Sequence, residues 1–330
     1  MTESITKNSE QIISVLRERI NEQLLKIINE YSSPESLYVP MKYVLEGSGK
    51  RIRPILTLLV AEMFGPVEES AMHVATSLEI MHNFTLVHDD IMDEDHQRRG
   101  RPTVHIKWDI STGILSGDGL IALAYKILLR AESARIKLLA EVFTDGLIDI
   151  CEGQAYDKDF ETRTNVSIDE YLMMIGKKTG RLLAMCCRMG GIINGADYEQ
   201  QQHLEHFGYE IGQAFQIQDD LLELTSTMDV MGKSLGSDVF ENKKTFLIIK
   251  AREMAEPGVK KQLDDLLAQQ QHTETDFDIA KELLAQTGVI EYTQSEVRKR
   301  IISAKQSLDA LHLNSGHIDY LTNQILHRKS

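Results

Sequence analysis

Apolar residues recur at intervals of three and four along most of this 330-residue chain. This is the period of an α-helix with one buried face, whereas a half-buried strand alternates at every second residue. Alternating runs of Val, Ile and Thr are scarce, and the chain has only 6 Pro. The pattern therefore predicts an all-α protein whose helices bury their apolar faces against one another.

Turn signals divide this pattern into separate helices. The separating stretches are YSSPES, EGSGKR, FGPVE, RRGRP, INGAD and EPG. The predicted helices span residues 8–31, 34–46, 54–64, 68–93, 115–130, 134–160, 167–192, 197–227, 242–253, 257–271, 276–304 and 316–328. The sequence contains no repeat, no low-complexity linker and no shift in composition. We therefore expect a single-domain helical bundle over residues 1–330.

The composition excludes several classes of protein. With a formal net charge of −14 the chain is not expected to bind nucleic acid. No apolar run reaches about 18 residues, and the N-terminus MTESITKNSEQ is too polar for a secretion signal. We therefore expect a cytoplasmic protein without stable membrane insertion. Cys151, Cys186 and Cys187 have neither CxxC nor metal-ligand spacing, so they are expected to be reduced packing residues.

Acidic residues crowd the stretch LVHDDIMDEDHQRRGRPTVH, residues 86–105, at the end of a predicted helix. Asp89 and Asp93 stand at i and i+4 on one helical face, with Asp90 one step round. Like charges at this spacing cost about 0.2–0.5 kcal/mol per pair, and negative charge at a helix C-terminus is also unfavourable. A merely solvated face fits poorly, because apolar residues interleave with these acids. The cluster therefore indicates a functional site.

A second cluster, AFQIQDDLLELTS, repeats this arrangement later in the chain, with Asp219, Asp220 and Glu223 at i, i+1 and i+4. Two carboxylate clusters on otherwise apolar helices suggest a shared cavity. Oxygen ligands without a Cys or His pattern favour a hard cation, most simply Mg²⁺. Such an ion retains positions for water and substrate phosphates.

Basic residues accompany the acidic clusters. They are Arg98 and Arg99 after the first cluster, Lys233 and Lys243 after the second, and Lys50, Arg51 and Arg53 in EGSGKRIRP. The last stretch is not a nucleotide P-loop, because Val44 replaces the first glycine and Arg51 the Ser/Thr. A glycine-rich turn with Lys and Arg can still bind a phosphate. Together with Mg²⁺ carboxylates, these cations indicate a diphosphate ligand.

At this point the motifs resemble those of the trans-isoprenyl diphosphate synthases, the polyprenyl synthetase family, and most closely its short-chain geranylgeranyl and farnesyl diphosphate synthases. The resemblance covers about residues 40–250. His82 stands seven residues before the first acidic motif, as in the family. The matching motifs are 49-GKRIRP-54, 89-DDIMD-93, 98-RRG-100, 178-KTG-180, 219-DDLLE-223, 232-GKSLGSD-238 and 243-KKT-245.

The resemblance implies a role for each matching residue and an all-α bundle of the isoprenoid synthase type around a central cavity. The implied ligands of Mg²⁺, normally three ions, are Asp89, Asp93 and Asp219, with Asp90, Asp220 and Glu223 in or near the shell. The implied allylic diphosphate site comprises Arg98, Lys178, Thr179, Gln216, Lys233 and Lys243. The implied isopentenyl diphosphate site comprises Lys50, Arg53, His82 and Arg99. The residues expected to take part in catalysis are Asp89, Asp90, Asp93, Arg98, Lys178, Asp219 and Lys233. Glu223 departs from the family, which commonly has Asp there, and is the least secure ligand.

The implied reaction is a head-to-tail condensation by a homodimeric prenyltransferase. The allylic diphosphate ionises, the isopentenyl double bond attacks the allylic cation, and a proton is lost to the released diphosphate. A closed apolar cavity would protect the cation from water.

Product length is expected to depend on Phe84 and Thr85, about one turn before Asp89 on the same helix. In the family a bulky residue at the position of Phe84 resembles short-chain enzymes. This favours geranylgeranyl diphosphate (C20), with farnesyl diphosphate (C15) close behind and longer products if Phe84 only packs the core. A class I terpene synthase and a noncatalytic subunit of a heteromeric prenyl synthase are the rival interpretations. GKRIRP, His82 and RRG argue against the first, and the intact acidic motifs argue against the second.

Overall fold

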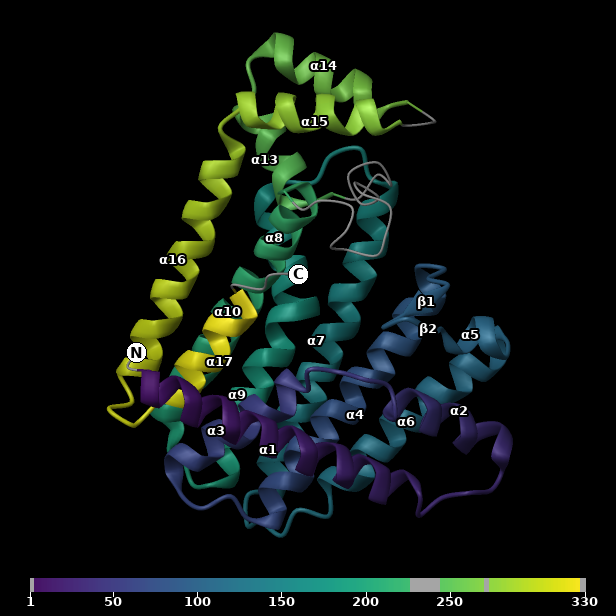
Figure 1. Cartoon of the computed structure of the whole chain (residues 1–330), viewed down its shortest axis with the longest axis vertical. Helices are drawn as coiled ribbons and strands as arrows, with labels where there is room; N and C mark the ends of the chain where they lie inside the picture. The colour runs from purple at the N-terminus through teal and green to yellow at the C-terminus, as the bar shows by residue number, and fades with distance from the viewer. Residues whose placement is uncertain (1–2, 226–243, 270–272, 327–330) are drawn as a thin grey trace. The chain divides into compact units, whose positions relative to one another are not determined.

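The computed structural model describes residues 3–225, 244–269 and 273–326 (Figure 1). The predicted all-α class is confirmed, since the described strands are two residues long each. The elements are α1 Glu3–Ile28, α2 Glu35–Leu45, α3 Ile52–Phe64, α4 Glu69–Met92, β1 Gln97–Arg98, β2 Arg101–Pro102, α5 Val104–Lys107, α6 Ile110–Leu128, α7 Ile136–Thr162, α8 Ile168–Ile175, the π-helical turn η1 Gly176–Gly180, α9 Arg181–Ile193, α10 Tyr198–Thr225, α13 Phe246–Met254, α14 Pro257–Leu267, α15 Glu274–Gln286, α16 Val289–Asp309 and α17 Gly316–Leu326. No helix among the described residues combines the length and apolar character needed to cross a membrane.

The chain forms two compact units. The first, hereafter the N-terminal unit, comprises Met1–Thr144, Met185–Glu205 and Leu311–Leu321. The second, the C-terminal unit, comprises Asp145–Ala184, His206–Ala310 and Thr322–Ser330. The single domain expected from the sequence stays a prediction.

The centre of the N-terminal unit is α4, which packs most extensively on α6 and also on α3. Nearly the whole first half of α4 is buried, as its apolar pattern predicts. The approach of α6 is very close. A Cβ added to Gly117 of α6 would lie 2.1 Å from Nε2 of His88 in α4. Glycine at this position therefore allows the two helices to meet.

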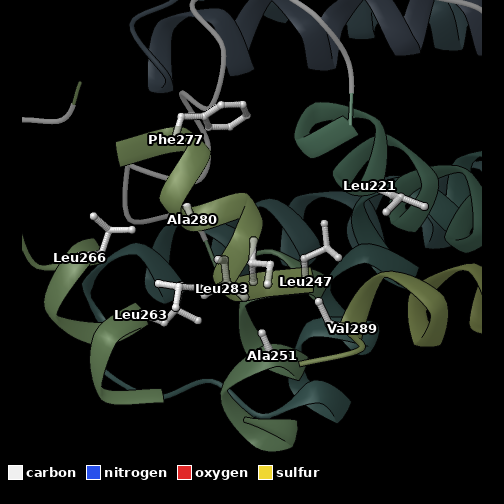
Figure 2. Packing of buried hydrophobic residues seen from close by; sticks show 11 residues of the cluster. Leu221, Leu247, Ala251, Leu263, Leu266, Phe277, Ala280, Leu283 and Val289 are labelled. Carbon is white, nitrogen blue, oxygen red and sulfur yellow. The ribbon is translucent and has the colours of Figure 1, made fainter. Parts of the chain in front are cut away.

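The C-terminal unit has its own apolar core, formed mainly by residues of α13, α14, α15 and α16 (Figure 2). Leu247 and Ala251 of α13 meet Leu263 of α14, Leu284 of α15 and Val289 of α16 there. In Figure 1 α14 and α15 lie side by side, and they contact each other.

The predicted helix 276–304 is wrong. Gly288 has φ of 72°, in the left-handed region that ends helices, so α15 stops at Gln286 and α16 begins at Val289. The turn lets both helices contribute to one core, because Leu284 before it and Val289 after it are both fully buried. The hairpin β1–β2, the short helix α5 and the turn η1 were not predicted either.

Candidate active site

The glycine-rich stretch 46–50 leads into α3, which begins directly after Arg51. Arg51 has φ of 51°, and 4% of the residue is exposed. Its Nη1 lies 2.8 Å from Oε1 of Glu79 in α4, and its Nη2 donates to the carbonyl oxygens of Leu45 and Gly47. Arg51 therefore holds this turn in place from inside the protein, whereas its neighbour Lys50 is exposed.

Arg53 and His82, two predicted isopentenyl diphosphate ligands, lie together. Nη1 of Arg53 lies 3.0 Å from Nε2 of His82. Burial and the nearby arginines hold the pKa of His82 well below its usual 6.5, so the imidazole is neutral and Nε2 accepts from Arg53. The other ring nitrogen, Nδ1, is buried and has no hydrogen-bond partner among the described residues. The pair thus joins α3, which carries Arg53, to α4, which carries the buried His82.

Arg99 reaches the same turn from the β1–β2 hairpin. A Cβ added to Gly49 would lie 2.9 Å from Nη1 of Arg99, so glycine leaves room for this guanidinium. Arg99 and Gly100 form the tip of the hairpin with φ of 53° and 73°. Two consecutive positive φ values are typical of a type I′ turn, for which glycine is favoured at the second position. The RRG motif is therefore a tight turn that presents an arginine.

Tyr43 of α2, which belongs to none of the sequence motifs, anchors this hairpin. Its hydroxyl donates to the Pro102 carbonyl at 2.8 Å. The guanidinium of Arg101 and the ammonium of Lys107 each lie 3.8 Å from the centre of its ring, at the distance of cation–π contacts. A pocket opens between α2, α4 and the hairpin, and Arg98 and Arg99 belong to its lining.

In the first acidic motif the aspartates differ in burial. Asp90 is 4% exposed, and its Oδ1 lies 2.5 Å from Nε of Arg98. Burial raises the pKa of Asp90 above 3.8, although Arg98 opposes the shift. Asp89 is half-buried and Asp93 is exposed, and the Asp93 N–H donates to the Asp89 carbonyl at 2.8 Å. Asp89 and Asp93 thus share one turn at the end of α4, while Asp90 binds the hairpin.

In the second acidic motif, on α10, Asp219 and Asp220 are both half-buried, and Asp220 accepts hydrogen bonds from the protein. One oxygen of Asp220 accepts from the Tyr171 hydroxyl at 2.5 Å and from the Phe246 N–H at 2.9 Å. Its other oxygen accepts from Nε2 of Gln216 at 3.3 Å. Asp220 is therefore engaged by protein donors of α8, α10 and α13, and Asp219 is half-buried.

The KTG motif lies in the π-helical turn η1. Nζ of Lys178 lies 2.5 Å from Oδ2 of Asp157 in α7, and the Thr179 hydroxyl donates to Oε1 of Gln216 at 3.2 Å. A Cβ on Gly153 of α7 would lie 2.4 Å from the Lys178 backbone nitrogen, so α7 and η1 are in backbone contact. Within the C-terminal unit Lys178 and Thr179 thus lie in one turn, and Thr179 contacts Gln216 of α10.

For three predicted site residues the structure describes no side chain. Lys233 and Lys243 fall outside the described residues, as does the side chain of Glu223. Among the described residues no three His, Cys, Asp or Glu side chains converge as metal ligands. Mg²⁺ in phosphate sites is held by one or two carboxylates together with substrate phosphates and water. The carboxylates of Asp89 and Asp93, one turn apart, fit this coordination.

Of the two predicted chain-length residues, Phe84 packs its ring edge against the His88 imidazole, with centroids 4.9 Å apart. The Thr85 hydroxyl donates to the His82 carbonyl at 2.8 Å. Both side chains are half-buried.

Comparisons with known proteins show which chains this one is similar to. The model of the polyprenyl synthetase family matches residues 34–284. The geranylgeranyl diphosphate synthase of Methanosarcina mazei is 39% identical over 280 residues, 84% of this chain and 85% of that protein. The geranylfarnesyl diphosphate synthase of Natronomonas pharaonis is 37% identical over 326 residues and covers 93% of both chains. The solved geranylgeranyl pyrophosphate synthetase of Pyrococcus horikoshii has a TM-score of 0.88 at 34% identity, covering 97% of this chain and 99% of that chain.

The family match extends over well over half of the chain, and it contains both acidic motifs, the basic turn, the hairpin and η1. The chain therefore belongs to the polyprenyl synthetase family and is a prenyltransferase.

Proposed function

We propose that the protein condenses isopentenyl diphosphate head to tail with allylic diphosphates and releases geranylgeranyl diphosphate (C20). The observation that carries this proposal is a basic cluster in which Arg53 contacts His82 and Arg99 lies against Gly49, with burial and both guanidinium charges lowering the pKa of His82. A class I terpene synthase ionises an allylic diphosphate but needs no second diphosphate site. Arg53 and Arg99 supply positive charge, and Gly49 leaves room for the Arg99 guanidinium. This arrangement supports a second diphosphate substrate.

Isopentenyl diphosphate would lie at this cluster, with Lys50 as a further cation. The guanidinium groups of Arg53 and Arg99 donate in the planar geometry that matches phosphate oxygens. His82 is neutral, so its protonated Nδ1 could donate a hydrogen bond without adding charge. These residues would orient the substrate's double bond for attack.

The allylic diphosphate would be held by residues of the C-terminal unit. Lys178, Thr179 and Gln216 support this role through their shared position at η1 and α10. By resemblance Arg98, Lys233 and Lys243 would complete the site. These cations would stabilise the negative charge that develops on the leaving diphosphate. Released diphosphate would then accept the proton.

Magnesium dependence is general in this family, and we propose Asp89, Asp93 and Asp219 as the protein ligands, with three ions by resemblance. Bound Mg²⁺ supplies Lewis acidity and neutralises phosphate charge. The inward hydrogen bonds of Asp90 and Asp220 support a different role for these two residues. They would orient Arg98 and α10 rather than coordinate an ion directly. Glu223 stays a proposed ligand by resemblance.

The C20 product is proposed from the bulk of Phe84. The ring lies on α4 one turn before Asp89, where it would stop a growing chain that runs along the helix. The names of similar proteins include both geranylgeranyl and geranylfarnesyl (C25) diphosphate synthases, so product length needs a direct measurement.

The test is to incubate the purified protein with Mg²⁺, isopentenyl diphosphate and a C5, C10 or C15 allylic diphosphate, and to identify products by mass spectrometry. A C20 product supports the proposal. Products beyond C25 would preserve the condensation and refute the role of Phe84. Consumption of the allylic substrate without isopentenyl diphosphate would indicate a terpene synthase. No turnover would indicate a noncatalytic subunit.

We further propose that the enzyme acts as a cytoplasmic homodimer. Support comes from large apolar side chains exposed on neighbouring helices of the N-terminal unit: Val39, Ile106, Ile110, Ile114 and Leu115. Such residues are enriched at subunit interfaces and unfavourable in water. Light scattering of the purified protein measures the oligomeric state, and Ile110→Asp is expected to shift a dimer towards the monomer.

A further inference from the structure

The turn η1 contains a switch in backbone hydrogen bonding. The Gly176 N–H donates to the Leu172 carbonyl, four residues earlier, as in an α-helix. The Arg181 N–H donates to the Gly176 carbonyl, five residues earlier, as in a π-helix. A single π-turn accommodates one extra residue, is rare, and is frequent at functional sites. Because it is less favourable than a regular α-turn, its surroundings have to hold it.

One support is direct backbone contact with α10. A Cβ on Gly212 would lie 2.6 Å from the Cα of Gly180. A Cβ on Gly176 would lie 2.0 Å from the Tyr209 hydroxyl oxygen. Both ends of η1 are thus packed on α10 with no room for further side chains.

The second support is Gln213 of α10, which is 4% exposed. Its Nε2 donates to the Leu172 carbonyl at 2.8 Å. The Leu172 carbonyl therefore accepts two hydrogen bonds, one from the Gly176 N–H and one from Gln213. It is the last carbonyl of the α-helical pattern before the π-turn. Gln213 stands one turn before Gln216, which contacts Thr179 inside η1.

Arg300 of α16 determines how the Gln213 amide is oriented. Its Nη1 donates to Oε1 of Gln213 at 2.6 Å. A guanidinium can only donate hydrogen bonds, so the amide oxygen has to face Arg300 and the amide N–H₂ faces Leu172. Glu210 and Glu296 flank Arg300 at 3.5 and 3.6 Å.

From this geometry we infer that Gln213 and Arg300 are positioning residues for the reaction. The hydrogen bonds from Arg300 to Gln213 and from Gln213 to the Leu172 carbonyl hold the π-turn. That turn presents Lys178 and Thr179 to the allylic diphosphate. The inference rests on the proposed function and deepens it, because it connects the allylic site to a distant element, α16.

The first test is Gln213→Glu. The carboxylate still accepts from Arg300, but it has no N–H for Leu172 and places an oxygen against the carbonyl. We expect kcat/KM for the allylic diphosphate to fall about tenfold, because displaced catalytic groups lose that much or more. The KM for isopentenyl diphosphate should stay within about twofold, because that site is separate.

Arg300→Met and Arg300→Lys form the second test. The Met variant removes the donor to Gln213 and should reproduce the allylic defect, whereas Lys can still donate to Oε1 and should restore most of kcat/KM. This pair keeps the inference testable if Gln213→Glu fails to fold.

The matched control is Ser303→Ala, which removes a different hydrogen bond between α10 and α16, between Oγ of Ser303 and Nε2 of His206 at 3.0 Å. It should leave both substrates' kinetic constants unchanged. Equal losses for both substrates, or normal kinetics in Gln213→Glu and Arg300→Met, would overturn the inference while wild-type turnover still supports the proposed function. An inactive wild-type protein would instead refute the proposed function.

Discussion

Replacing Glu79 by glutamine preserves the size of the side chain and removes the charge that compensates Arg51. Both side chains are almost fully buried, with 2% of Arg51 and 3% of Glu79 exposed, and their charged atoms lie 2.8 Å apart. In Glu79→Gln the guanidinium stays charged, because arginine does not lose its proton in proteins. The variant therefore contains a buried cation without its counterion.

The expected cost follows from this burial. Removing one partner of a buried ion pair destabilises a protein by about 3–5 kcal/mol. The glutamine oxygen can still accept from Arg51, and the acceptors on Asn21, Leu45 and Gly47 remain. We therefore expect the lower end, about 3 kcal/mol, which is a large part of the ~5–15 kcal/mol stability of a typical protein.

The assay is urea unfolding followed by the fluorescence of Trp108, the single tryptophan of the chain. Trp108 is half-buried beside Tyr43, with ring centroids 5.3 Å apart, so its emission reports the N-terminal unit, which also contains Arg51 and Glu79. The protein concentration has to be equal in all samples, because association shifts apparent stability.

The matched control is Glu141→Gln in the same unit. Glu141 pairs with Lys137 at 3.7 Å, but the two side chains are 55% and 90% exposed, so the urea midpoint should not change. A loss below about 1 kcal/mol in Glu79→Gln would refute the reasoning. Arg51→Met combined with Glu79→Leu should recover most of the loss, because neither charge is then buried.

Three further predictions concern the site. Gly49→Ala should raise the KM for isopentenyl diphosphate about tenfold and leave that for the allylic substrate unchanged, because its Cβ would displace the Arg99 guanidinium; equal effects on both substrates would contradict this. Because the folded-state pKa of His82 lies below 6.5, the unfolded state binds its proton first, so wild-type stability should fall as pH drops below 6.5, by up to about 1.4 kcal/mol per pH unit from this group. Urea unfolding of His82→Gln should show a weaker pH dependence than the wild type, and an identical dependence would argue against a depressed pKa. Phe84→Ala should lengthen the products seen by mass spectrometry, whereas an unchanged product would remove Phe84 as the stop.

The helices were largely predictable because their period is a local property of the sequence. α4 was predicted over residues 68–93 and spans Glu69–Met92. Residues 276–304 were read as one helix because the apolar period continues through Gly288. The chain turns there, since one straight helix could not place both Leu284 and Val289 in the same core.

In the candidate site, residue types and spacing were predictable and their partners were not. By residue type Lys50, Arg51 and Arg53 are similar, and only the resemblance singled out Lys50 and Arg53 as isopentenyl diphosphate ligands. Burial then separated them, because Arg51 meets Glu79 in α4 while Arg53 meets His82. Tyr43 and Gln213 had no sequence signal, since their roles depend on contacts with Pro102 and Leu172, which are distant in sequence.

The sequence by itself determined the all-α class, the two acidic motifs and the membership of the family, because helical period and motif spacing are carried by neighbouring residues. Only the tertiary structure decided which protein groups contact Asp90 and Asp220. Asp90 and Asp220 lie next to Asp89 and Asp219 on the same helices, and a helical pattern alone does not rank them. Asp90 turns to Arg98 of the hairpin and Asp220 to Tyr171 of α8. A carboxylate that is buried, as in Asp90, or half-buried, as in Asp220, needs such donors to offset its lost hydration, and Arg98 and Tyr171 come from other elements of the fold.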